Sequence, residues 1–242
     1  METTIQVSGL CKSYMENKVI ENLSLSVRAG EVYGLLGENG AGKSTTIECM
    51  LGTQKADAGK VQILGLNPWE NRKRLFEQVG VQFQEVNYPD KIKVWELCEE
   101  TACLYKYPVV YEKLLQKFGL FDKKKAFVSE LSGGQKQKLF IILALIPGPK
   151  VVFLDELTTG LDTKARRDIW KSLQELKGQG LTIFLSSHFM DEVEILCDRI
   201  GILKDGGFVF EGTISEAIEL SPYKKLEDAY LWFTGEEKTD YE

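Results

Sequence analysis

A glycine-rich turn between an apolar strand and a helix restricts most strongly what this chain can fold into. Residues 37–44 read GENGAGKS, which fits the phosphate-binding pattern G-x-x-x-x-G-K-[ST]. The turn follows the apolar run 31–36 and precedes a helical stretch over 43–51 that ends at Gly52. Glycines let successive backbone N–H groups point inward, and the helix N-terminus adds partial positive charge at the same place. The pattern therefore predicts a nucleotide-binding loop in an α/β core.

The remaining periodicity predicts a parallel sheet with a helical insertion. Residues 163–176 have helical spacing between the apolar runs 151–154 and 181–185, which makes a βαβ unit. Residues 93–146 show helical spacing without a convincing strand. Further strands are predicted at 23–27, 61–64, 79–83 and 200–203, and a hairpin turn at 205–207.

Composition excludes several classes of protein. The longest apolar run, residues 139–146, is far shorter than the about 20 residues of a membrane-spanning helix, and the N-terminus lacks signal-peptide features. The 5 cysteines are odd in number and contain no C-x-x-C pair, which argues against a disulfide framework and a structural zinc site. The net charge of −6 gives no general attraction to nucleic acid. We therefore expect a cytoplasmic protein with no nucleic-acid partner.

Two carboxylates follow the buried strand 151–154. Ligands gather at the carboxyl ends of parallel strands, so Asp155 and Glu156 should emerge beside the loop that carries Lys43 and Ser44. Lys43 would reach the β- and γ-phosphates, Ser44 and Asp155 would hold Mg²⁺, and Glu156 could accept a hydrogen bond from the attacking water. The competing interpretation is an acidic pair that starts a loop or caps a helix.

Two polar residues follow other strands in the same way. His188 is the only histidine, and it comes directly after the strand at 181–185. There it could donate to the γ-phosphate, although a lone histidine is more often structural. Gln84 follows the strand at 79–83 and could ligate the metal or orient water; the alternative is a plain surface glutamine.

Residues 131–135, LSGGQ, precede an apolar helix. Two glycines and a hydroxyl at a helix N-terminus form a second anion-binding nest, but no lysine completes it. Either a second polypeptide uses this nest to close over the γ-phosphate, or Ser132 is simply an N-cap followed by turn glycines.

Taken in order, these motifs resemble the ATP-binding subunit of an ABC transporter. The resemblance runs from about residue 10 to residue 212 and depends most on LSGGQ lying between the two nucleotide motifs; the positions that carry it are Tyr14, 37–45, Gln84, 131–135, 155–156, 160–162 and His188. It implies one ABC ATPase domain over 1–242. The core would be 1–84 and 151–215, with a mixed sheet and an N-terminal antiparallel portion, the inserted helical subdomain about 85–150, and the helical tail 215–242.

The resemblance also implies a role for each motif residue. Tyr14 would stack on adenine, Gln84 would sense Mg²⁺ and water, and Glu156 would be the general base with His188 on the γ-phosphate. Asp162 would lie at the junction of two subunits. The residues that would hold the phosphates of one ATP are Asn39, Gly40, Ala41, Gly42, Lys43, Ser44 and Thr45, and those that would cover the ATP of the opposite subunit are Ser132, Gly133, Gly134 and Gln135.

Three positions depart from the family's usual pattern. Leu157 stands where proline is usual, Lys138 replaces a common arginine, and residues 147–149 (PGP) make a stiffer helix exit. None of them removes a catalytic group, so we expect an active ATPase.

The hypothesis favoured by the sequence is a motor subunit that dimerises with a second, identical ATPase subunit around two Mg·ATP. Because the chain has no membrane span, the transport pathway would belong to an integral membrane permease, with the ATPase on the cytoplasmic face. The sequences of residues 38–46 and 188–199 resemble those of exporters of drugs, peptide antibiotics or lipids. The alternatives are a soluble ABC ATPase acting in translation or DNA repair, and a regulatory module without turnover.

Overall fold

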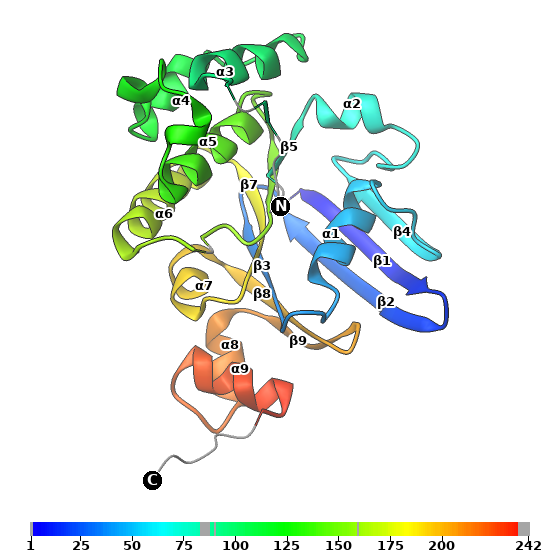
Figure 1. Ribbon diagram of the computed structural model, residues 1–242. Coiled ribbons are helices and arrows are strands. Elements are labelled where there is room, and N and C mark those ends of the chain that lie inside the picture. The colour runs from blue at the N-terminus through cyan, green and yellow to red at the C-terminus, as the bar shows by residue number, and fades with distance from the viewer. Residues whose placement is uncertain (1, 83–87, 90, 159, 237–242) are drawn as a thin grey trace.

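The structure is a computed structural model that describes residues 2–82, 88–89, 91–158 and 160–236 (Figure 1). Its elements in chain order are β1 (Thr3–Tyr14), β2 (Asn17–Arg28), β3 (Val32–Leu36), α1 (Lys43–Leu51), β4 (Ala58–Ile63), α2 (Arg72–Phe76), β5 (Val79–Gln82), α3 (Val94–Cys103), α4 (Tyr111–Lys117), η1 (Phe121–Lys123), η2 (Val128–Glu130), α5 (Gly133–Leu145), β6 (Val151–Leu154), α6 (Thr163–Gly178), β7 (Thr182–Ser187), α7 (Met190–Leu196), β8 (Arg199–Lys204), β9 (Gly207–Gly212), α8 (Ile214–Leu220) and α9 (Leu226–Thr234).

The central sheet has the strand order β5-β6-β7-β3-β8-β9. All neighbours are parallel except β9, which pairs antiparallel with β8 through the hairpin at Asp205 and Gly206. The strands β3, β6 and β7 are buried along their whole length, as expected where helices and a second sheet cover both faces. The carboxyl ends of β3, β6 and β7 therefore meet at one edge of the sheet.

A second, antiparallel sheet of order β2-β1-β4 packs with α1 on one face of the central sheet. Figure 1 shows α1 and this sheet on the right, and α6 and α7 on the left. Aromatic rings fill the core between the sheets: Tyr33 stacks on Phe184 with ring centroids 5.5 Å apart, and Phe153 meets Phe184 at a tilt with centroids 5.3 Å apart. This packing fixes the strand that precedes the phosphate-binding loop.

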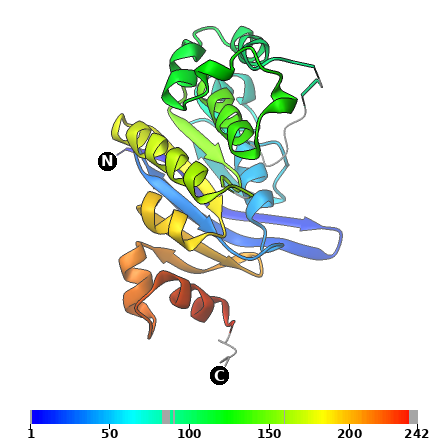
Figure 2. The same ribbon diagram turned by 60° about the vertical axis from the view of Figure 1, so that its left-hand side comes forward.

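The helices α3, α4 and α5 form a group at one end of the molecule, above α6 (Figure 2). Their apolar residues share one cluster with α6 and the inner face of β6 and β7. Strand β5 approaches α5 so closely that a Cβ atom at Gly80 would lie 1.9 Å from the carbonyl oxygen of Ala144. The helical insertion is therefore joined to the core by packing as well as by the chain.

The α/β class with a mixed sheet and an antiparallel N-terminal sheet is confirmed, and the helix predicted over 43–51 has those bounds. Strand limits differ in detail. Leu64, predicted within a strand, has a φ of 51° and lies in the turn after β4. Strand β7 begins one residue later than predicted, at Thr182, and extends to Ser187. Residue 83 of the strand predicted over 79–83 is outside the described part of the chain.

Candidate functional site

The phosphate-binding loop joins β3 to α1 in a conformation that only glycine adopts readily. Gly40 and Gly42 have φ values of 87° and 104°, and a Cβ atom at Gly42 would lie 2.8 Å from the carbonyl oxygen of Val19. Gly42 is the N-cap of α1, with no side chain capping the free N–H groups of the first turn. Those N–H groups are therefore available to an anion.

The Lys43 side chain lies inside the loop. Its Nζ donates hydrogen bonds to the carbonyl oxygens of Gly37 at 2.7 Å and Glu38 at 2.9 Å. Burial lowers the pKa of Lys43, and the nearby carboxylates of Glu156 and Asp155 oppose that shift. The ammonium group is thus held between carbonyl oxygens of the loop and the acidic strand end.

One cavity brings the loop together with residues from two other strand ends. It has a volume of about 610 Å³, within the range of small-molecule sites. Glu156 and His188 line it together with Val19 and loop residues Asn39, Gly40, Gly42, Lys43, Ser44 and Thr45. Val19, on β2, was not among the residues singled out in the sequence, because an isolated valine carries no chemical signal.

Asp155 and Glu156 are held by a serine on the neighbouring strand. Ser186 Oγ donates a hydrogen bond to Asp155 Oδ1 and accepts one from the Glu156 N–H at 3.0 Å. Ser186 is fully buried and Asp155 is 6% exposed. Glu156 has a φ of 49°, in the left-handed region that non-glycine residues rarely adopt. Ser186 was not predicted as a site residue, although the pair of serines before His188 at a strand end was a usable signal.

The oxygen donors at this strand edge fit a magnesium ion. Mg²⁺ prefers one or two carboxylates together with hydroxyl, water and substrate phosphate oxygens. The Asp155 carboxylate and the exposed Ser44 at the start of α1 are the described residues that would hold it. Within the described ranges no three His, Cys, Asp or Glu side chains gather into a metal cage. Gln84 lies outside the described residues.

His188 follows β7 directly and lines the cavity opposite the loop. Its ring lies against that of Phe189, with centroids 4.1 Å apart. The Phe189 N–H donates to Ser187 Oγ at 3.0 Å, which turns the chain sharply after the strand. The structure therefore presents the histidine to the same space as Lys43 and Glu156.

The LSGGQ segment does not line this cavity. Ser132 is the N-cap of α5 and forms a capping box, in which the Gln135 N–H donates to Ser132 Oγ at 3.3 Å and the Ser132 N–H to Gln135 Oε1 at 3.0 Å. The turn packs on α6, where a Cβ atom at Gly134 would lie 2.8 Å from Ala165 Cβ. Asp162 caps α6 by accepting the Ala165 N–H at 2.9 Å. The turn and Asp162 are thus neighbours, apart from the phosphate-binding loop of the same chain.

Tyr14 also lies outside the cavity lining. It is at the end of β1, pairs with Asn17 of β2 and is 44% exposed. The Lys12 ammonium lies 5.1 Å from the centroid of the Tyr14 ring. The ring is therefore accessible for stacking beside the turn that joins β1 to β2.

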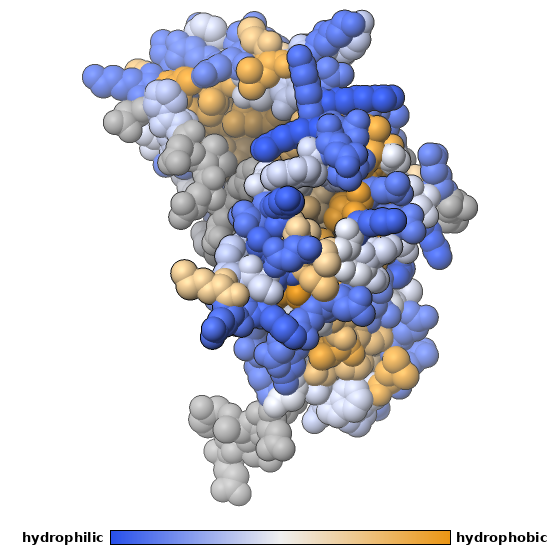
Figure 3. All heavy atoms as spheres, turned by 90° about the vertical axis from the view of Figure 1, so that its right-hand side faces the viewer, coloured by the Kyte–Doolittle hydropathy of each residue, from blue (hydrophilic) through white to orange (hydrophobic). Residues whose placement is uncertain are grey.

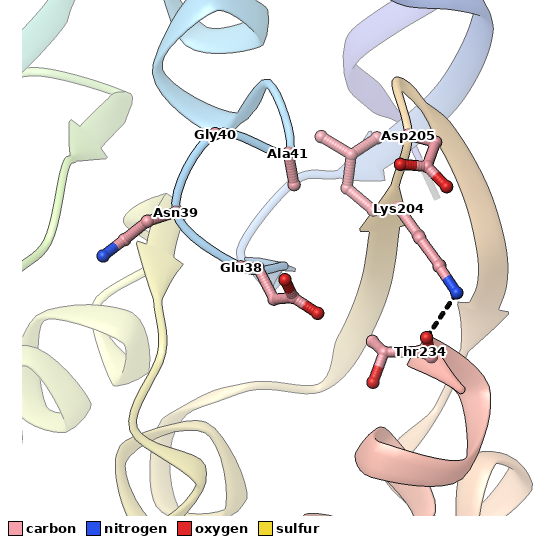
Figure 4. A pocket seen from close by; sticks show the side chains of 8 residues that line it. Glu38, Asn39, Gly40, Ala41, Lys204, Asp205 and Thr234 are labelled. Atoms are coloured by element: carbon pink, nitrogen blue, oxygen red, sulfur yellow. Dashed lines mark hydrogen bonds between the residues drawn. The ribbon is translucent and has the colours of Figure 1, made fainter. Parts of the chain in front are cut away.

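The C-terminal helix ends across a hollow from the phosphate-binding loop. In Figure 4 the Glu38 side chain points toward Lys204, which donates a hydrogen bond to the carbonyl oxygen of Thr234 at the end of α9. These residues line a hollow of about 230 Å³. A hydrogen bond to Glu236 and the charge of that residue raise the pKa of Glu38. The end of α9 is thus coupled electrostatically to the loop.

Comparison with known proteins decides the family. The model of the ABC transporter family matches residues 20–159. The chain belongs to the ABC transporter family. Nod factor export ATP-binding protein I of Rhizobium etli is 40% identical over 227 residues, which cover 90% of this chain and 70% of that protein.

Solved structures of ABC cassettes share the fold. A structure of an ATP-binding subunit of an ABC transporter has a TM-score of 0.87 and 28% identity, and the match covers 96% of this chain and 99% of that one. The dimeric cassette MJ0796, bound to ADP and Pi, has a TM-score of 0.77 at 24% identity, covering 86% and 98%, and shows the fold alone. The chain is thus an ABC ATP-binding subunit, an ATPase coupled to transport. Among the residues described, no helix combines the length and apolar character that crossing a membrane requires.

Proposed function

We propose that this ABC ATPase works as a dimer of identical subunits that closes around two Mg·ATP and drives export through a separate membrane permease. One observation carries the proposal. The phosphate-binding loop, Glu156 and His188 line a single cavity, whereas the LSGGQ turn of the same chain lies elsewhere. Each chain therefore holds one nearly complete phosphate site and one unused anion nest.

A second copy would supply what each site lacks. The N–H groups at the start of α5 that the capping box does not use would form a nest suited to a phosphate, and the Ser132 hydroxyl lies beside it. In the proposed dimer the residues Ser132, Gly133, Gly134 and Gln135 cover the ATP on the opposite loop, and Asp162 lies at the junction. The dimeric state of MJ0796 is compatible with this arrangement because the fold is shared.

Hydrolysis in the proposed site depends on groups fixed by the strand ends. Glu156 would accept a proton from the attacking water, and His188 would donate a hydrogen bond to the γ-phosphate as its charge develops. Lys43 and the loop amides would hold the β- and γ-phosphates, with Tyr14 stacked on adenine. Magnesium would neutralise phosphate charge. Ser44 and Asp155 would hold the ion. That Gln84 ligates the metal or orients the attacking water stays a prediction.

The permease would dock between the helical region and the core. Figure 3 shows hydrophobic atoms in a recess below the helices at the top of the molecule, on the face that includes the N-terminal sheet. Trp69, just before α2, and Trp95, on α3, are 55% and 37% exposed. Exposed aromatic side chains are typical of protein interfaces. This docking would place the ATPase on the cytoplasmic face of the membrane, with residues 1–242 acting as one cassette and about 85–150 as its helical subdomain.

Export is supported by the relatives named as Nod factor export ATP-binding proteins. The same relatives do not favour a soluble role in translation or DNA repair.

The test is Glu156→Gln in the full chain. The amide cannot accept the proton from water, so we expect ATP binding to be retained while phosphate release falls about 10²-fold or more, with an ATP-bound dimer accumulating in size-exclusion chromatography. Glu219→Gln, on the exposed face of α8, is the matched control and should behave as the native chain. Unchanged turnover in Glu156→Gln would remove Glu156 from its role, and a species that stays monomeric with ATP would refute the dimer.

A further inference from the structure

A buried carboxyl group lies behind His188 and is not used by the proposed function. Glu192, on α7, is 0% exposed. Trp170 Nε1, on α6, donates a hydrogen bond to Glu192 Oε1 at 2.9 Å. Carboxyl groups are rarely fully buried unless they are paired with hydrogen-bond donors, so this arrangement is a specific one.

The same carboxyl group lies near the end of β7 and the loop after β6. Burial raises the pKa of Glu192, and the neighbouring Ser187 hydroxyl, the Trp170 N–H and the Thr158 hydroxyl oppose part of the rise. Among the described residues, Glu192 Oε2 and Thr158 Oγ1 have no hydrogen-bond partner, so the Trp170 N–H is the donor that holds the carboxyl group. Ser187 immediately precedes His188, and Thr158 lies two positions after Glu156. Glu192 thus lies between the end of β7 and the loop after β6, and its hydrogen bond with Trp170 connects α7 to α6.

An exposed contact connects the same elements. Arg166 Nη1 lies 3.4 Å from Asp191 Oδ2, and its guanidinium lies 5.2 Å from the centroid of the Phe189 ring. Solvent-exposed ion pairs of this kind contribute little to stability. The buried Glu192–Trp170 pair is therefore the stronger link between α6 and the segment that carries His188.

We propose that Glu192 is a positioning residue, which fixes the His188 segment relative to Glu156 and to the start of α6. The inference depends on the proposed function, because that function places His188 at the γ-phosphate and Asp162 at the dimer junction. Asp162 caps α6, and Trp170 lies on the same helix. Displacement of α6 when two copies close is therefore transmitted through Trp170 and Glu192 to His188.

Glu192→Ala tests this in the full chain. Within the described ranges its carboxyl group hydrogen-bonds to Trp170 and not to the phosphate-binding loop, so we expect ATP affinity and KM within about twofold of native while kcat falls about tenfold, the loss expected when a catalytic group is misplaced. Glu192→Gln keeps an acceptor for the Trp170 N–H and nearly the same side-chain shape, so it should retain at least about half of the native kcat. Glu194→Gln, on the exposed side of α7, is the matched control and should leave kcat unchanged.

Trp170→Phe keeps the test decisive if Glu192→Ala does not fold. It retains an aromatic ring but lacks the N–H donor, and we expect kcat to fall about threefold with KM unchanged. A native kcat in Trp170→Phe together with a native kcat in any folded Glu192→Ala would overturn the proposal. A parallel loss of ATP affinity and kcat would overturn it too, because it would indicate a general structural defect.

A double variant separates this inference from the proposed function. If Glu192 acts through His188, adding Glu192→Ala to His188→Ala causes no further loss of kcat, whereas independent effects would multiply to about a tenfold further loss and overturn the proposal. His188→Ala alone is expected to lower kcat about 10²-fold. Native turnover in His188→Ala would contradict the proposed function itself. A slow His188→Ala beside a fast Glu192→Ala would contradict only the positioning role.

Discussion

The substitution Ser186→Ala tests how the acidic strand end is held. The Ser186 hydroxyl donates to the Asp155 carboxylate and accepts the Glu156 N–H at 3.0 Å. Alanine removes both hydrogen bonds and leaves the rest of β7 unchanged. Because Ser186 is fully buried, water cannot replace the lost hydroxyl without a rearrangement.

The size of the effect follows from these two bonds. A hydrogen bond to a charged group contributes about 1.5–3 kcal/mol and a neutral one about 1 kcal/mol, so the free energy of unfolding should fall by about 2.5–4 kcal/mol. For a chain of this length that lowers Tm by about 5–15 °C. Without its hydrogen bond to Ser186, the Glu156 backbone is held less firmly. If transition-state stabilisation falls by the about 1 kcal/mol of that neutral bond, kcat should fall about fivefold.

The assay is calorimetric unfolding combined with steady-state phosphate release at saturating Mg·ATP. Ser172→Ala is the matched control, because Ser172 is also buried but its hydroxyl donates at 3.0 Å only to the carbonyl oxygen of Asp168 in its own helix. A Ser186→Ala chain with native Tm and native kcat would refute the reasoning. A lower Tm with native kcat would refute the link between Ser186 and the placement of Glu156.

The remaining predictions concern the loop, the nest, the C-terminal helix and the core. Lys43→Ala should abolish nucleotide binding measured by calorimetry, and native affinity would contradict its phosphate contact. Mixing Lys43→Ala with Ser132→Ala subunits should restore phosphate release in the heterodimers, because one of the two shared sites is then intact; failure to exceed either variant alone would count against sites shared between copies. Glu236 raises the pKa of Glu38, so the folded state favours the protonated form of Glu38. The stability that this protonation contributes is complete below the ordinary pKa of 4.5 and is lost as pH rises through the raised pKa. In Glu236→Gln, Tm should therefore fall less than in the native chain as pH is raised from 4.5, and identical slopes would exclude this coupling. Phe184→Ala should lower the free energy of unfolding by about 3–5 kcal/mol in a denaturant titration, since its fully buried ring packs on two others, whereas a loss below about 1 kcal/mol would mean that the core closes over the gap.

Local pattern was enough to predict the phosphate-binding loop and much of the fold. The loop residues 37–44 are consecutive in the sequence, and their chemistry depends on the backbone conformation of that one turn. The spacing of residues 163–176 predicted α6, and strict alternation predicted the middle of β2. Strand β1 was not predicted as a strand, because several register irregularities against β2 interrupt its alternation.

The pairing of Ser186 with Asp155 depended on the order of the strands. Ser186 meets Asp155 across 31 positions of sequence because β6 and β7 are neighbours in the sheet. No periodicity within either strand indicates which hydroxyl faces which carboxylate. The same holds for Glu192 and Trp170, 22 positions apart, which meet because α6 and α7 pack together.

The sequence by itself determined that this protein has a phosphate-binding loop, an acidic strand end and a separate glycine-rich nest, since each is a short motif whose backbone and side-chain chemistry is local. Only the tertiary structure decided that Glu156 and His188 share a cavity with Lys43, that Ser186 accepts the Glu156 N–H, that Glu192 meets Trp170, and that Gly134 packs on α6. The physical reason is that hydrogen bonds between different strands and helices depend on strand order and helix packing, which residue spacing along one element does not specify.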